Sequence, residues 1–174
     1  DLVEKKLVTD QMVLTIGYDI DNLWAPEIKG AYKGEVTTDH YGRKIPKPAH
    51  GSINLNCRTS STRIIMDAVM ELYEQIINPK LLIRRVTIAA NHLVDEAQAK
   101  ETGQFEQLDL FTDYASLEKE RKEEEERRSR ERKLQEAMLS VKKKFGKNAI
   151  LKGMNLQEGG TTIERNHQIG GHKA

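Results

Sequence analysis

The chain has 174 residues, a length that suits one ordinary domain with additional segments, and its formal net charge is only +1. Hydrophobic residues make up 37% and charged residues 32% of the sequence, so we expect a modest core and a solvated extension. The single cysteine, Cys57, excludes an internal disulfide and indicates a reducing compartment. No apolar run approaches the roughly 20 residues that cross a bilayer, so we expect no membrane partner. The first residues show neither a methionine start nor a signal peptide, so we expect a cytoplasmic chain that is a fragment of a longer protein.

The first fifty residues predict a helix end, a strand and a long connection. Residues 1–7 have the character of the last turns of a helix, and residues 9–18 alternate as a strand does, with Met12, Leu14 and Ile16 on one side. Residues 21–50 contain three prolines and several glycines. We therefore expect a long loop there, and loops of this length are usually functional or mobile.

A second strand, a helix and a third strand follow. Residues 52–58 alternate between an apolar and a polar side, and the Ser/Thr run at 59–62 offers N-caps for a helix. Apolar residues then recur at helical spacing until Asn78-Pro79 ends the pattern. Residues 81–90 predict the third strand. This order of elements predicts an α+β fold in which an antiparallel sheet has helices on one face.

The character of the chain changes after residue 95. Every residue of 118–133 except Ser129 is charged, and the signs are mixed, which predicts a solvated helix that acts as a spacer. An apolar seam with spacings of four, three and four then consists of Leu134, Met138, Val141 and Phe145. We expect this short seam to pack on its own protein rather than to form a coiled coil. Gly146 stands where a helix C-cap belongs, and the remaining tail is polar and rich in glycine.

The polar side of the predicted sheet is the first candidate for a binding site. Short hydrogen-bonding side chains alternate there with arginines: Ser52, Asn54, Asn56, Arg58, Arg85 and Thr87. Such a mixture suits phosphate oxygens, which accept hydrogen bonds without regard to base identity. The alternative is an ordinary solvated face of an antiparallel sheet, which is common.

A short peptide in a polar stretch is the second candidate. It consists of Gln107, Leu108, Asp109, Leu110 and Phe111. An extended peptide of this kind can bury its leucine and phenylalanine in a partner's pocket while the glutamine forms a hydrogen bond at the edge. The alternative is that these residues dock on their own domain.

The sequence holds no pattern of an enzyme active site. It has no glycine-rich nucleotide loop or nucleophile elbow, and no pair of carboxylates on strands that would suit two metal ions. His167 and His172 lie on a glycine-rich tail without a nearby cysteine, so we expect no zinc site.

Several of these segments resemble a known family. Cys57-Arg58-Thr59 and Leu82–Val86 are similar to the little-finger domain of Y-family translesion DNA polymerases, in the UmuC/DinB-like branch of the ImpB/MucB/SamB type. The peptide 107–111 resembles the bacterial β-clamp-binding pentapeptide at all five positions. The segments 144–150 and 169–174 resemble the C-terminal elements of UmuC-type proteins.

The resemblance implies a domain organisation and a set of DNA contacts. Residues 1–95 would form a little finger of the βαββαβ type without its first strand and most of its first helix. A linker with the clamp-binding peptide (96–115), the charged helix (116–146) and a C-terminal tail (147–174) would follow. By position, the resemblance implies contacts to the DNA backbone by Arg58, Thr59, Arg84 and Arg85. The strand alternation adds Asn54 and Asn56, and we expect Arg43, Lys44 and Lys47 in the long connection to extend the DNA footprint.

The function implied is that of a non-catalytic, C-terminal portion of a DNA-directed DNA polymerase acting in translesion synthesis, DNA repair and the SOS response. Its partners would be primer-template DNA and the bacterial β sliding clamp. Nucleotidyl transfer with Mg²⁺ would belong to a palm domain that this chain lacks, so we expect no cofactor here. Two alternatives remain open. One is a ferredoxin-like RNA-binding module, although the predicted polar face has no aromatic residue for stacking on bases. The other is a structural adaptor whose charged helix pairs with a partner.

Overall fold

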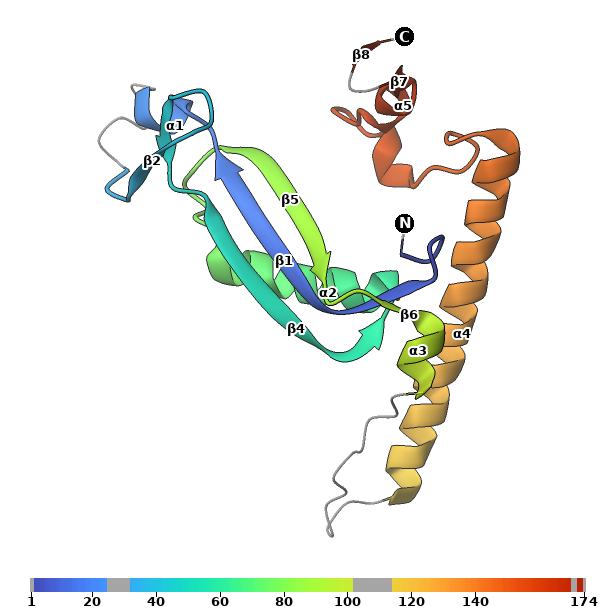
Figure 1. Ribbon diagram of the computed structural model, residues 1–174. Helices are drawn as coiled ribbons and strands as arrows, with labels where there is room; N and C mark the ends of the chain where they lie inside the picture. Colours follow the sequence, from blue (N-terminus) through green and yellow to red (C-terminus); the bar gives the residue numbers. More distant parts are fainter. Residues whose placement is uncertain (1, 25–31, 102–113, 170–171, 174) are drawn as a thin grey trace. The chain divides into compact units, whose positions relative to one another are not determined.

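The computed structural model describes residues 2–24, 32–101, 114–169 and 172–173 (Figure 1). The chain divides into two compact units, one built mainly from Lys6–Phe105 and the other mainly from Glu106–Ala174. The first unit combines an antiparallel sheet with helices, and the second contains one long helix and shorter elements. The predicted α+β class, with an antiparallel sheet and a long C-terminal helix, is therefore confirmed.

The sheet of the first unit has its longest strand at the centre. Strand β1 (Leu7–Tyr18) lies between β4 (Ala49–Thr59) and β5 (Ile83–Asn91), and both neighbours run antiparallel to it. The short strand β6 (Val94–Asp95) pairs with the beginning of β1 and leads into helix α3 (Glu96–Glu101). Strands β4 and β5 therefore form the two edges of this sheet.

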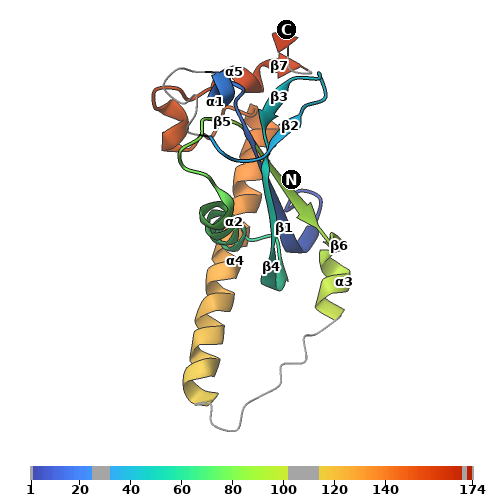
Figure 2. The same cartoon turned by 90° about the vertical axis from the view of Figure 1, so that its left-hand side faces the viewer.

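Helix α2 (Thr62–Ile76) packs on one face of the sheet over β4 and β1 (Figure 2), and Val86 and Ile88 of β5 remain exposed. The Ser61 hydroxyl caps the helix by accepting a hydrogen bond from the amide of Ile64 at 3.4 Å. Val69 and Leu72 of the helix are buried against alternate residues of β1. The core therefore consists of one side of α2 packed on one side of β1. Its other buried members are Met12, Leu14, Ile16, Tyr18 and Leu81. The helix that the sequence predicts between residues 62 and 77 is confirmed.

The beginning of the chain is not helical. Residues 2–6 form a turn in which the amide of Leu7 donates to the carbonyl of Leu2 at 2.9 Å, so the predicted helix end over residues 1–7 is wrong. Strand β1 begins at Leu7 because Leu7 and Val8 pair with Asp95 and Val94. That pairing joins residues nearly ninety positions apart, and no local pattern predicts it.

The long connection contains regular structure. Helix α1 (Asp21–Trp24) is followed, after a stretch outside the described residues, by a hairpin of β2 (Val36–Thr38) and β3 (Lys44–Pro46). The expectation of a loop throughout residues 21–50 is therefore wrong. Pro46 is fully buried, and β3 contacts both β1 and α1, so the base of the hairpin is anchored on the first unit.

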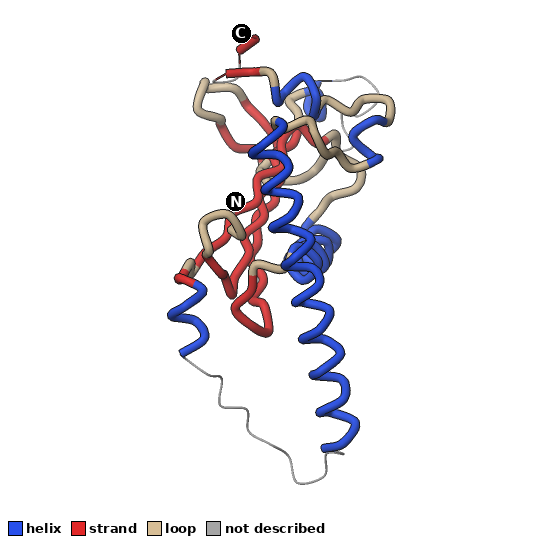
Figure 3. The backbone as a smooth tube through the Cα atoms, turned by 90° about the vertical axis from the view of Figure 1, so that its right-hand side faces the viewer, coloured by secondary structure: helices blue, strands red, loops and turns tan. Residues whose placement is uncertain are grey.

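The second unit is dominated by helix α4 (Tyr114–Phe145), which stands out in the tube view (Figure 3). Ion pairs at helical spacing line it, among them Lys122–Glu118 at 2.8 Å and Arg132–Glu136 at 2.8 Å. Gly146 ends the helix with a φ of +95°, a conformation that suits a glycine C-cap. A 3-10 helix η1 (Gly153–Leu156), helix α5 (Thr162–Asn166) and the pair β7 (Gln168–Ile169) and β8 (His172–Lys173) complete the unit.

The apolar seam of α4 is open at both of its ends. Leu134 is 62% exposed and Phe145 is 67% exposed. Neither residue is therefore buried within the second unit, and the expectation that the seam packs on its own protein stays a prediction.

Across the parts of the chain that are described, no helix combines the length and the apolar character needed to cross a membrane.

Candidate nucleic-acid interface

The face of the sheet opposite α2 is polar, and we call it the open face. The register places Gln11 of β1 between Asn54 and Asn91, and Thr15 between His50 and Thr87. Alternation along the paired strands then assigns to the open face Gln11, Val13, Thr15, His50, Ser52, Asn54, Arg85, Thr87, Ala89 and Asn91. The register of β1 and β4 shifts between Thr9 and Gln11, so alternation does not place Asn56 and Arg58, which follow Asn54 on β4, on this face. All the residues contributed by β4 and β5 are exposed. The structure therefore brings Ser52, Asn54, Arg85 and Thr87 of the predicted polar side onto one face, whereas Asn56 and Arg58 lie beyond the register shift of β1 and β4.

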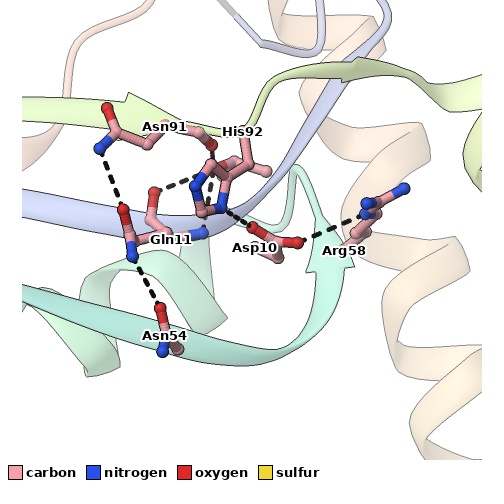
Figure 4. Close-up of polar contacts among 7 residues, drawn as sticks. Asp10, Gln11, Asn54, Arg58, Asn91 and His92 are labelled. Atoms are coloured by element: carbon pink, nitrogen blue, oxygen red, sulfur yellow. Dashed lines mark hydrogen bonds and ion pairs between the residues drawn. The ribbon is translucent and has the colours of Figure 1, made fainter.

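Three amide side chains form a ladder across the open face (Figure 4). The amide nitrogen of Asn91 donates to Gln11 Oε1 at 3.0 Å, and the amide nitrogen of Gln11 donates to Asn54 Oδ1 at 2.9 Å. The ladder fixes the direction of all three amides. One nitrogen of Asn54 and one oxygen of Asn91 therefore stand at its two ends, where they can meet a ligand's acceptor and donor.

A carboxylate holds two basic side chains beside the ladder. Asp10 Oδ1 lies 2.8 Å from Nδ1 of His92, and its Oδ2 lies 3.4 Å from Nε of Arg58 (Figure 4). The hydrogen bond with His92 is the main reason that the pKa of Asp10 lies below its ordinary value. Burial of the carboxylate has a smaller, opposite effect, and Arg58 lowers this pKa further. Asp10 therefore holds Arg58 and His92 together beside the register shift of β1 and β4.

The opposite end of the open face carries Arg85. It lies opposite Gly17, whose missing side chain leaves the arginine stem uncrowded. Among the described residues Arg85 has no ion-pair partner, unlike Arg84. Thr87 lies two residues further along the same side of β5, and the hydroxyl of Thr15 contacts Nδ1 of His50 at 2.9 Å nearby.

Arg84 lies at the rim of the sheet rather than on the open face. The register shifts between Gly17 and Tyr18, and the guanidinium of Arg84 reaches Asp19 Oδ2 at 3.3 Å. A hydrogen bond from the amide of Asp21 is the main reason that the pKa of Asp19 is lowered. Arg84 lowers this pKa further, whereas burial raises it. The structure thus separates two neighbouring arginines: Arg84 has an acidic partner, whereas Arg85 points to the open face.

Thr59 lies away from the exposed residues. It is buried, and its hydroxyl accepts a hydrogen bond from the amide of Ser61 at 3.0 Å. Its visible role is to shape the turn from β4 into α2.

The three basic residues of the long connection lie on or next to the hairpin. Arg43 pairs with Asp39 at 2.7 Å and Lys47 pairs with Glu35 at 2.7 Å, whereas the amine of Lys44 donates to the hydroxyl of Thr38 at 2.9 Å. The pair with Glu35 raises the pKa of Lys47. Of the three, only Lys44 is seen with a neutral partner, so it adds most to the local positive charge.

The predicted clamp-binding peptide, residues 107–111, lies outside the described residues. Within the described part of the chain, no group of three His, Cys, Asp or Glu side chains is placed to hold a metal ion.

Sequence patterns did not reveal the ladder or the Asp10 cluster. Asn54 follows from alternation along β4, but Gln11, Asn91 and His92 become neighbours only through the register of the strands. In the structure His92 follows β5 in a left-handed conformation, with a φ of +51°.

Comparison of the chain with protein-family models, with curated proteins and with solved structures finds no match.

Proposed function

We propose that this chain is the C-terminal DNA-binding and clamp-tethering portion of a DNA-directed DNA polymerase that acts in translesion synthesis. Its open face holds the backbone of primer-template DNA, and residues 107–111 bind a sliding clamp. The observation that carries the proposal is the open face itself, a surface of amides and hydroxyls with Arg85 on one side of the sheet.

The chemistry of the open face suits phosphate. Amide and hydroxyl donors and arginines bind phosphate oxygens irrespective of sequence, as a polymerase that moves along DNA requires. The exposed carboxylates of α2 (Asp67, Glu71 and Glu74) lie on the helix, away from this face. A chain with a net charge of only +1 therefore still has one side that favours a polyanion.

The dimensions also suit a duplex. Three strands spaced about 4.8 Å apart place the outer backbones about 10 Å apart, close to the roughly 12 Å width of the DNA major groove. No Phe, Tyr or Trp belongs to the open face as the described strands define it, which disfavours an RNA-binding sheet that stacks bases.

Binding of labelled primer-template DNA, followed by fluorescence anisotropy, tests the proposal. We expect Arg85→Ala to weaken binding about tenfold, which corresponds to roughly 1.4 kcal/mol for one charge-assisted contact. Arg85→Lys should retain part of the affinity. Arg63→Ala is the matched control, because Arg63 is an exposed arginine on α2. Equal losses in Arg85→Ala and Arg63→Ala would point to nonspecific attraction and contradict the proposed face.

Binding of the chain to a purified bacterial sliding clamp tests the tether. We expect Leu110→Ala/Phe111→Ala to abolish binding, because these two side chains would fill the clamp's pocket. Leu134→Ala/Phe145→Ala is the control, since it removes the same residue types from exposed positions on α4. Clamp binding that survives loss of Leu110 and Phe111 would exclude residues 107–111 as the tether.

A further inference from the structure

The hairpin of β2 and β3 presents an aromatic ring on a tightly organised turn, which we call the tip (residues 39–43). Asp39 organises it: its Oδ1 accepts hydrogen bonds from the amides of Tyr41 and Arg43, both at 2.9 Å. Its Oδ2 accepts from Nε of Arg43 at 2.8 Å and contacts the other guanidinium nitrogen at 2.7 Å. Gly42, at a φ of +79°, closes the turn.

The tip holds Tyr41 out into solvent. Its side chain is 78% exposed, the largest exposed fraction among the bulky apolar side chains of the described residues. The guanidinium of Arg43 lies 5.2 Å from the centre of the tyrosine ring, and the His40 ring meets it edge-on at 5.5 Å. A single exposed tyrosine needs no explanation, but one held by a preorganised turn between an arginine and a histidine does.

The surroundings of Tyr41 suit a nucleobase better than an apolar protein pocket. A base offers a flat π-surface to the ring and a phosphate within reach of a cation. Here Arg43 already stacks on the ring, and Lys44 adds a positive charge whose visible partner is the neutral hydroxyl of Thr38.

The hairpin lies at the Arg85 end of the open face. Lys47, just after β3, donates its amide to the carbonyl of Glu35 at 2.8 Å, and β4 begins two residues later. The first residue of β4 pairs with Ile16, next to the Gly17–Arg85 pair. Figure 1 shows β2 beside α1, beyond the arrowhead of β1. The hairpin is therefore anchored at the end of the open face where Arg85 lies, on the side where a DNA strand leaving that face at this end would pass.

We propose that Tyr41 stacks on an unpaired base of the single-stranded template next to the duplex held by the open face. Arg43 and Lys44 contact the adjacent phosphates, and Asp39 positions both Tyr41 and Arg43. The inference rests on the proposed function, because it assigns the single-stranded part of the same DNA to a second site. It adds a stacking residue that the polar open face does not supply.

Two labelled DNA substrates of equal duplex length, one with a 5′ template overhang and one blunt, test this inference by anisotropy. We expect Tyr41→Ala to weaken binding of the overhang substrate about 5- to 100-fold, in line with loss of one base stack, and to leave blunt-duplex binding within about twofold. Tyr41→Phe keeps the ring and should bind like the wild type. Arg85→Ala should weaken binding to both substrates.

The outcomes separate the two proposals. If Tyr41→Ala binds both substrates as the wild type does, or loses both equally, the stacking site is wrong while the open face stands on the Arg85 result. If the wild type binds neither substrate, the DNA-binding function fails and the stacking site fails with it. Urea unfolding of Tyr41→Ala should match the wild type, since the ring is exposed.

Discussion

Gly51 lies where β4 passes closest to helix α2. A β-carbon at this position would lie 3.0 Å from Leu72 Cδ1 and 3.1 Å from Ile76 Cγ2, closer than side chains normally pack. The absence of a side chain therefore sets the distance between the helix and the sheet.

We expect Gly51→Ala to destabilise the first unit by about 1–3 kcal/mol, because the helix or its side chains must shift to admit a methyl group. Gly17→Ala is the matched control: its β-carbon would meet that of Arg85 at 3.5 Å, an ordinary contact. Urea unfolding measures both variants. A Gly51→Ala protein as stable as Gly17→Ala would show that the packing is looser than the distances indicate.

Asp39 provides a prediction about pH. The hydrogen bond from the Arg43 side chain is the largest cause of the lowered pKa of Asp39. Burial raises this pKa by a smaller amount, and the amides of Tyr41 and Arg43 lower it further. Because the pKa of Asp39 is lower in the folded state, its ionised carboxylate stabilises that state at pH values above 3.8, the ordinary pKa of an aspartate. The stabilisation is lost as the pH falls through the lower value.

Nuclear magnetic resonance can follow this titration through the amide shifts of Tyr41 and Arg43. We expect both to change with one midpoint below 3.8, the ordinary value for an aspartate. In Asp39→Asn this step should be absent. A midpoint at or above 3.8 would mean that the ion pair does not hold the tip in solution.

At the scale of elements, α2 stabilises the sheet through a narrow stripe of buried side chains. Leu72 is 3% exposed and contributes to the only buried cluster that the described residues form around β1. Leu72→Ala should lower the free energy of unfolding by about 2–5 kcal/mol. Met70→Ala, on the exposed side of the same helix, should change it by no more than about 0.5 kcal/mol. Similar effects in both variants would place the core elsewhere.

Local patterns predicted the elements whose signals are local. Ser61 and the spacing of Val69 and Leu72 define α2 within the sequence, and Asn78-Pro79 ends it. Alternation along β4 predicted its exposed side because one face packs on α2. These signals require no knowledge of distant partners.

Elements that depend on distant or unusual pairing were not predicted. The three-residue strands β2 and β3 are too short for alternation to show, and the five-residue turn between them is not the common two-residue hairpin turn. The turn at residues 2–6 depends on β6. In the candidate site, alternation along residues 81–90 placed Arg84 and Arg85 on opposite sides of the strand, but the pairing of Arg84 with Asp19 beside the register shift at Tyr18 was not predicted.

At the scale of the whole molecule, we expect DNA binding to depend on the local charge around each basic residue rather than on the net charge of the chain. Arg43 and Lys47 have carboxylate partners, whereas the visible partner of Lys44 is a hydroxyl. We therefore expect Lys44→Ala to weaken DNA binding more than Lys47→Ala, because Lys47→Ala also releases the negative charge of Glu35. Anisotropy at constant ionic strength measures the difference. Equal losses in both variants would show that the ion pair with Glu35 opens on binding.

The salt dependence of DNA binding tests the open face most directly. Each phosphate neutralised by a basic side chain contributes about 0.9 to the slope of log K against log salt concentration. We expect the wild type to bind primer-template DNA more weakly as salt rises, and Arg85→Ala to reduce the slope by about one unit while Arg63→Ala leaves it unchanged. Binding without salt dependence, or with equal slopes in the wild type and Arg85→Ala, would contradict a phosphate contact on the open face.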